Sequence, residues 1–359
     1  MDKLKCAALN FTFQSNYLDH LAPLCFVMKM PLLLTEEAQK EQLRKYYPQI
    51  EYELIPNYTD IDYFALAQKY DMFFQTNMWE EEPIKLFAEA TNKKVRLVYL
   101  PHGNSDKGHR SEFFLQSLFK QDIALLYGDH IIDRIKRLDL WEKCPSWVRI
   151  GNFRFQFYRF FKCFYDDIAK KEVFDRFPKK QKTILYAPSW LDPEGSTSFF
   201  KMAKKIAEQI PEDYNFILKC HPNLEEMHPH LYYSVIDDFK DRENVLILTD
   251  FPLIYPLLAK TDVFLGDFSS VGYDFLSFGG PMFFFDVLGQ KDLEDPSHQL
   301  HRVGKQIPLE YYDRIFEYIR NNWDEKLIEA QKQLYDFTFG SEISFDKLRQ
   351  EIITTYYKK

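Results

Sequence analysis

Cysteine is scarce in this sequence of 359 residues, and none of the cysteines forms a CxxC pair. An odd number of scattered cysteines predicts neither a zinc site nor a disulfide framework. A reducing cytoplasm is therefore the expected compartment. The five cysteines are Cys6, Cys25, Cys144, Cys163 and Cys220.

A secretion signal and a long apolar run are also missing. The opening residues, Met1 to Lys5, are not followed by an apolar core with a small-residue cleavage site. The longest apolar stretch near the start, Leu21 to Leu34, has about 14 residues, interrupted by Lys29 and two prolines, whereas a helix needs roughly 20 to cross a bilayer. We expect a cytoplasmic protein whose association with a membrane is at most peripheral, at the inner face.

The chain has no excess of positive charge. Its formal net charge is -8 and its pI is about 5.7. Because phosphate backbones select basic surfaces, nucleic acid is not an expected partner.

Apolar residues and chain length are ample by contrast. With 46% hydrophobic residues in 359, the chain is expected to form two domains of about 150 to 200 residues each. Short apolar runs alternate with helical patterns in both halves, which predicts an α/β fold of two facing, Rossmann-like, doubly wound parallel-sheet domains with a cleft between them. We expect one domain at 1–152, a connection at 153–180, a second domain at 181–325, and a helical region at 326–359 as a candidate for packing back on the first domain.

Aromatic residues make up 17% of the chain and are concentrated in Phe153 to Tyr165, where basic residues separate them. One interpretation is a patch that lies in a membrane interface. The other is a helix that joins two packed domains, and the acidic balance of the chain favours it.

The stretch 261–286 has the pattern of a strand, a loop, a helix and a second strand. Its apolar run at Val263 to Leu265 breaks at Gly266, and Ser269 and Ser270 follow at the predicted helix start. Free backbone N–H groups and the positive end of a helix dipole suit a phosphate there. The alternative is that serine, a favoured N-cap, only begins the helix.

Three other predicted strands also end in loops with chemically capable side chains. A lone histidine at a strand end is usually structural, but histidines at equivalent places in two facing domains favour a ligand cleft. A further histidine, His20, lies at the start of the first predicted helix and is either a rival base or a surface residue. Asp60 and Asp62 have the DxD spacing of some metal sites, but their position favours a helix start. The residues in the three loops are His102, Ser189, and the group Lys219, His221 and Asn223.

Four blocks of the sequence resemble the CDP-glycerol glycerophosphotransferase family of teichoic-acid enzymes. They are PHG at 101–103, ILYAPSW at 184–190, LKCHPN at 218–223 and the stretch 249–286. The resemblance covers roughly residues 95 to 290 and implies the two-domain GT-B fold, with an N-terminal acceptor domain and a C-terminal nucleotide-donor domain. It implies transfer of phosphoglycerol, or a related phosphopolyol, from a CDP-activated donor to a hydroxyl of a glycan or lipid-linked acceptor.

The resemblance also assigns roles to residues. His102 matches the histidine of the family's His-Gly motif, a proposed base, with His20 as the alternative base. His221 matches the histidine of an Arg-x-His-Pro motif near the donor phosphates, although Lys219 replaces the arginine, which leaves the donor's identity open. No cofactor or metal is expected. The other residues expected to bind the donor are Ser189, Lys219, Asn223, Asp267, Ser269 and Ser270.

Two alternatives remain at this point. The same fold serves a nucleotide-sugar glycosyltransferase or a UDP-sugar 2-epimerase, because the loops around Ser269 suit UDP equally well. A catalytically silent nucleotide-binding protein is the other, since Lys219 and Phe268 both depart from the family's motifs.

Overall fold

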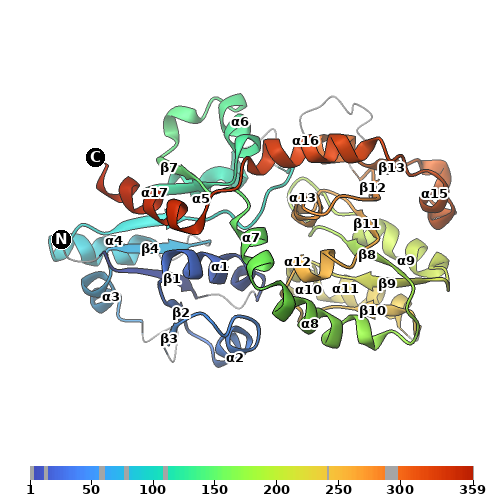
Figure 1. Ribbon diagram of the computed structural model, residues 1–359, viewed down its shortest axis with the longest axis horizontal. Helices are drawn as coiled ribbons and strands as arrows, with labels where there is room; N and C mark the ends of the chain where they lie inside the picture. Colours follow the sequence, from blue (N-terminus) through green and yellow to red (C-terminus); the bar gives the residue numbers. More distant parts are fainter. Residues whose placement is uncertain are drawn as a thin grey trace. The chain divides into compact units, whose positions relative to one another are not determined.

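The computed structural model describes residues 4–11, 15–55, 61–76, 81–107, 112–240, 242–287 and 298–358. The chain divides into two compact units (Figure 1). Unit 1 comprises residues 1–102, 110–160 and 337–359, and unit 2 comprises 103–109 and 161–336. The domain limits expected at 152, 180 and 325 stay predictions, because these units are not contiguous in sequence.

Unit 1 contains a seven-stranded sheet in the order β3-β2-β1-β4-β5-β6-β7, with every neighbouring pair parallel. Strands of this kind are buried on both faces, which is why they read as continuous apolar runs. The strands are β1 (Cys6–Asn10), β2 (Leu32–Leu34), β3 (Tyr52–Leu54), β4 (Met72–Gln75), β5 (Arg96–Tyr99), β6 (Ile123–Leu126) and β7 (Ser146–Arg149).

Helices from both ends of the unit 1 sequence pack together. Figure 1 shows α17, from the C-terminal end, on the same unit as the N-terminal strands, and α1 contacts both α7 and α17. The ring of Phe26 lies 5.4 Å from Phe157 and 5.7 Å from Phe345, measured between centroids. The helices are α1 (Leu18–Met28), α2 (Glu37–Tyr46), α3 (Tyr63–Lys69), α4 (Glu81–Ala90), α5 (Gln116–Phe119), α6 (Asp129–Arg137), α7 (Phe153–Phe160) and α17 (Phe345–Tyr357).

Unit 2 contains a six-stranded parallel sheet in the order β10-β9-β8-β11-β12-β13. The strands are β8 (Lys182–Ala187), β9 (Tyr214–Leu218), β10 (Val245–Ile247), β11 (Val263–Gly266), β12 (Met282–Phe285) and β13 (Lys305–Ile307). The helices are α8 (Lys162–Glu172), α9 (Phe199–Gln209), α10 (Pro222–Met227), α11 (Pro229–Ile236), α12 (Tyr255–Leu258), α13 (Ser270–Phe275), α14 (Gln299–Arg302), α15 (Ile315–Asn321) and α16 (Leu327–Phe339), whose last three residues count with unit 1.

The expectation of two α/β units, each with a doubly wound parallel sheet, is confirmed. The strand β13 was not expected, because Lys305–Ile307 is short and mostly polar. The segment 153–165 is helical, and its Phe153 and Phe157 belong to the core of unit 1. Asp62 caps α3 by accepting from the Ala65 N–H, which is the helix-start role expected of it, whereas Asp60 lies outside the described residues.

Within the described ranges, no helix combines the length and the apolarity that crossing a bilayer requires.

Candidate active site

The carboxyl ends of β8 and β11 mark the switch point of the unit 2 sheet. From β8 the chain runs outward to β9 and β10, then returns to β11 on the other side of β8. Doubly wound sheets bind ligands in the crevice at such a point. Ser189 follows β8 and Asp267 follows β11, and the two strands are paired through Ala187 and Gly266.

Asp267 joins the two loops at this switch point. Its carboxylate is fully buried and accepts the Ser189 N–H at 2.8 Å on one oxygen. The other oxygen accepts the backbone N–H and the hydroxyl of Ser198, both at 2.7 Å. Burial raises the pKa of Asp267 to about 6, against the lowering effect of these donors and of Lys107. Asp267, in the loop after β11, therefore holds the loop after β8 in place by accepting hydrogen bonds from Ser189 and Ser198.

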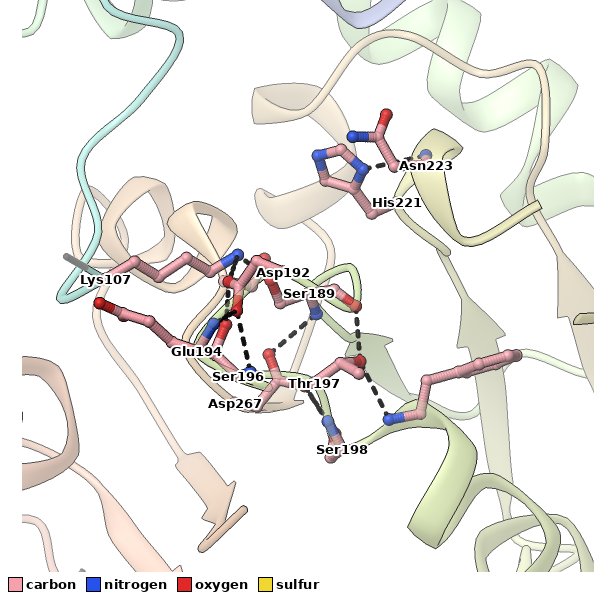
Figure 2. Close-up of polar contacts among 12 residues, drawn as sticks. Lys107, Ser189, Asp192, Glu194, Ser196, Thr197, Ser198, His221, Asn223 and Asp267 are labelled. Atoms are coloured by element: carbon pink, nitrogen blue, oxygen red, sulfur yellow. Dashed lines mark hydrogen bonds and ion pairs between the residues drawn. The ribbon is translucent and has the colours of Figure 1, made fainter. Parts of the chain in front are cut away.

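A buried lysine completes this cluster (Figure 2). The Lys107 ammonium donates to Ser189 Oγ, lies 3.2 Å from the Asp192 carboxylate, and sits 5.7 Å from the ring centre of Trp190. Burial lowers the pKa of Lys107, while the carboxylates of Asp192 and Asp267 raise it. Asp192 in turn accepts the N–H groups of Glu194 and Ser196, which fixes the loop after β8.

Lys107 and Asp192 were missed by the sequence reasoning. Both lie in loops that follow predicted strands, PHGNSDK after β5 and SWLD after β8. Their loop position was a usable signal, but the ion pair joins residues that are far apart in sequence. It becomes visible only when the segment 103–109 is found to pack with unit 2.

The loop after β9 carries three of the expected site residues, His221 as a catalytic residue and Lys219 and Asn223 as donor-binding residues. His221 begins α10, and its Nδ1 accepts the Asn223 N–H at 3.1 Å. An imidazole nitrogen that accepts this bond carries no proton, so Nε2 carries it in the neutral ring and can donate to an anion. The Lys219 ammonium donates to the Phe251 carbonyl at 2.6 Å. The His221 ring lies 6.2 Å from Trp190, which also lies beside Lys107.

Ser269 and Ser270 begin α13, as expected. The Ser269 hydroxyl accepts the Val271 N–H at 3.4 Å, so this serine does cap the helix. Gly103, whose φ is 127°, packs against Ser270. A Cβ added to Gly103 would lie 2.9 Å from the Cβ of Ser270. The glycine of the Pro-His-Gly motif thus has a packing reason of its own.

The two candidate bases lie together in unit 1. His20, on α1, and His102, after β5, have ring centres 6.4 Å apart, and Tyr17 lies 5.3 Å from His102. His20 is buried and His102 is exposed. The expectation that His20 is a surface residue of the helix is therefore wrong, because the first turn of α1 is buried.

The contacts of His20 favour a tautomer that can act as a base. The Tyr127 hydroxyl donates to the Pro101 carbonyl at 3.1 Å and lies 3.3 Å from His20 Nδ1. Since the hydroxyl has one proton, it accepts from Nδ1–H, which leaves Nε2 unprotonated. Burial, followed by the charges of Arg154 and His102, holds the pKa of His20 well below its usual range, so the ring is neutral at pH 7.

A second histidine cluster in unit 2 packs against Phe268, which lies in the Asp267–Ser270 loop. The His301 ring centre is 4.6 Å from Phe268 and 4.5 Å from Phe284, and His298 is 5.4 Å away. Neither ring nitrogen of His301 has a hydrogen-bond partner in the part of the chain that the structure describes. The pKa of His301 is lowered to about 4, mainly by burial, with Asp106 opposing this effect and His298 adding to it.

This burial predicts a loss of stability in acid. Between pH 6.5 and 4 the unfolded chain takes up a proton at residue 301 and the folded protein does not, so stability falls by about 3 kcal/mol. His301→Phe keeps an aromatic ring among Phe268 and Phe284 and should remove this contribution. Urea unfolding of both proteins at pH 7 and pH 4.5 measures the difference. An identical pH dependence in the two proteins would contradict the prediction.

Residues 165–298 match the family described as CDP-Glycerol:Poly(glycerophosphate) glycerophosphotransferase. The teichoic acid ribitol-phosphate primase of Bacillus spizizenii is 29% identical over 168 residues, which cover 44% of this chain and 40% of that protein. The teichoic acid ribitol-phosphate polymerase TarK of Staphylococcus aureus is 28% identical over 190 residues, 45% of this chain and 36% of that one. The matches therefore span less than half of either relative.

Solved structures show the fold across the whole chain. A variant of the wall teichoic acid polymerase TagF has a TM-score of 0.61 at 14% identity, covering 98% of this chain and 87% of that one. The UDP-GlcNAc 2-epimerase from Neisseria meningitidis bound to UDP-GlcNAc has a TM-score of 0.60 at 13% identity, covering 98% and 99%. The fold is thus of the GT-B class. Residues 165–298, which match the CDP-glycerol:poly(glycerophosphate) glycerophosphotransferase family, hold the switch-point loops of unit 2.

Proposed function

We propose that the protein is a transferase that moves a phosphopolyol from a CDP-activated donor to a hydroxyl of a glycan or lipid-linked acceptor. The observation that carries the proposal is the family match over residues 165–298. That region contains the loops of Ser189 and Asp267 at the switch point, where doubly wound sheets bind ligands, and the loop of His221 after the neighbouring β9. The names of the curated relatives, a primase and polymerases of ribitol phosphate, support the same chemistry.

In the proposed reaction, the acceptor oxygen forms a bond to the phosphorus of the polyol phosphate. The bond from that phosphorus to the CMP oxygen breaks, and CMP leaves with the electron pair. The acceptor's proton passes to a base, and donors on the protein stabilise the charge that develops on CMP. We assign the donor phosphates to His221 through Nε2–H and to Lys219, with Asn223, Ser269 and Ser270 as further contacts and Asp267 as the residue that holds their loops.

We assign the base to His102 and keep His20 as its rival. His102 is exposed and is therefore accessible to an acceptor. It also matches the histidine of the family's His-Gly motif. His20 has the support of its neutral ring and its unprotonated Nε2. The two lie close enough that a substitution at one changes the surroundings of the other.

The donor is the first property to test. The family's description specifies glycerophosphate, whereas all four curated relatives are named for ribitol phosphate. We expect CDP-ribitol or CDP-glycerol to raise the melting temperature, because a ligand that binds only the folded state stabilises it. The preferred donor should then release CMP when a polyol-phosphate primed acceptor is added, and the rate should persist in EDTA because no metal is assigned.

Other outcomes of this panel separate the alternatives. Stabilisation by UDP-GlcNAc alone would favour a nucleotide-sugar enzyme. Stabilisation by CDP-alcohols without CMP release from any acceptor would favour a catalytically silent binding protein. The absence of stabilisation by any CDP-alcohol would contradict the proposed function.

A further inference from the structure

The segment that follows His102 is anchored in unit 2, although His102 itself counts with unit 1. Asp106, four residues further along, is 3% exposed. The Tyr273 hydroxyl donates to its Oδ1 at 2.7 Å, and the Leu300 N–H donates to its Oδ2 at 2.9 Å. Tyr273 belongs to α13 and Leu300 to α14, so one carboxylate ties the segment to two helices. The next residue, Lys107, lies in the buried cluster of unit 2 shown in Figure 2.

The backbone is also held on the other side of His102. Strand β5 ends three residues before it, and the Pro101 carbonyl accepts the Tyr127 hydroxyl at 3.1 Å. The chain from His102 to Asp106 spans at most about 14 Å. His102 is therefore an exposed side chain on a short piece of backbone that is fixed at both ends.

We infer that Asp106 is a positioning residue for His102, the base of the proposed reaction. The inference rests on the proposed function for the role of His102. A base is efficient only while it stays within hydrogen-bond reach of the proton that it takes, so its backbone must be held in place. The Asp106 carboxylate does this by fixing the segment to α13 and α14. Gly103 supports the same arrangement, because it packs against Ser270, the first residue of α13.

Asp106 also has a structural effect, which must be separated from its effect on His102. Removing the carboxylate leaves the Tyr273 hydroxyl and the Leu300 N–H without this acceptor. It also removes a negative charge that raises the pKa of His301. A purely structural aspartate would change the rate by the same factor with or without His102. A positioning aspartate acts through His102, so its loss matters only while His102 is present.

A double-mutant cycle on the full chain tests this dependence. The variants are Asp106→Ala, His102→Ala and the double substitution. The measurements are the rate of CMP release at saturating donor and acceptor, and the affinity for CDP by titration calorimetry. We expect Asp106→Ala to lower the rate by about 10- to 100-fold, as a small displacement of a reacting group does, and to leave CDP affinity nearly unchanged. In the His102→Ala background the same substitution should lower the rate by less than about threefold.

Two further variants grade the effect. In Asp106→Asn the carbonyl oxygen can accept the Leu300 N–H while the amide N–H₂ donates to the Tyr273 hydroxyl oxygen, so the anchor persists without the charge. This variant should retain most of the rate that Asp106→Ala loses. Tyr273→Phe removes one of the two hydrogen bonds and should have a rate between the wild type and Asp106→Ala. Asp238→Ala, at an exposed aspartate of unit 2, is the matched control and should keep the wild-type rate.

Backbone order at His102 provides a readout that does not depend on catalysis. A rigid backbone amide has an NMR order parameter of about 0.85, and a flexible one has a value below about 0.6. We expect the His102 amide to move from the first value toward the second in Asp106→Ala. In Asp106→Asn and in Asp238→Ala it should stay at the first value.

Several outcomes would overturn the inference. Equal effects of Asp106→Ala in the two backgrounds, or unchanged order at His102, would show that Asp106 does not act through His102. A CDP affinity that fell by the same factor as the rate would place the effect in the donor loops instead. If Asp106→Ala does not fold, Tyr273→Phe decides by the same measurements. If the wild type releases no CMP, the proposed function fails, and the order parameter alone decides whether Asp106 holds His102 in place.

Discussion

His102→Ala is expected to lower the rate of CMP release in the presence of acceptor by about 10²- to 10⁴-fold, the usual contribution of a general base. The affinity for the donor should change little, because His102 is assigned to the acceptor's proton and not to the phosphates. Steady-state kinetics with the donor identified above, together with donor titration, measure the two quantities. His230→Ala, at an exposed histidine of α11, is the control and should keep the wild-type rate.

The pH profile of the same reaction separates His102 from His20. A general base works in its unprotonated form, so the rate falls as the pH drops through its pKa. Since burial and neighbouring charges hold the pKa of His20 well below 6.5, His20 as the base predicts full activity at pH 6.5 and a decline only at lower pH. His20→Ala should then abolish transfer as fully as His102→Ala. Activity that survived both His102→Ala and His221→Ala would show that these roles are wrong.

Asp267→Ala should have the largest effect on stability, about 3–5 kcal/mol of the free energy of unfolding. The substitution leaves three buried donors without an acceptor, namely the Ser189 N–H, the Ser198 N–H and the Ser198 hydroxyl. Each buried donor left unpaired costs about 1–3 kcal/mol, and the hydroxyl can rotate to recover part of this. Urea unfolding at pH 7.5 measures the change.

Asp267→Asn provides a graded comparison. It keeps one oxygen acceptor and places an amide N–H₂ against donors, so we expect a smaller loss than for alanine. Asp250→Ala, at an exposed aspartate of the same unit, should change the free energy by less than about 0.5 kcal/mol. A loss that small for Asp267→Ala would mean that the loops after β8 and β11 hold their shape without the carboxylate.

Periodicity in the sequence was enough to predict the two parallel sheets, because buried parallel strands such as β8 and β11 are continuous apolar runs. The same patterns placed His102, Ser189, His221 and Asp267 at strand ends. They could not show that both Asp267 oxygens are taken by backbone and hydroxyl donors. That arrangement depends on the pairing of β8 with β11, whose residues lie about 80 positions apart.

Contacts over still longer separations were also beyond sequence reasoning. The partner of His20 is Tyr127, 107 positions away, and the partner of Lys107 is Ser189, 82 positions away. Lysine is mostly exposed and tyrosine is only intermediate in burial, and nothing in their immediate neighbours marks these two as buried. Likewise β13 is too short and polar to give a strand pattern. It is a strand because it pairs with β12.

The composition of unit 1 from both ends of the chain has a consequence for biogenesis. Gly128 lies against the Thr338 carbonyl, where a Cβ would be 2.4 Å away, and the Arg349 guanidinium donates to the Val27 carbonyl at 2.6 Å. On the ribosome the strands of unit 1 emerge before residues 337–359, which pack on α1. Unit 1 therefore cannot complete its packing until all of unit 2 has been synthesised, and Phe26 lacks its contact with Phe345 until then.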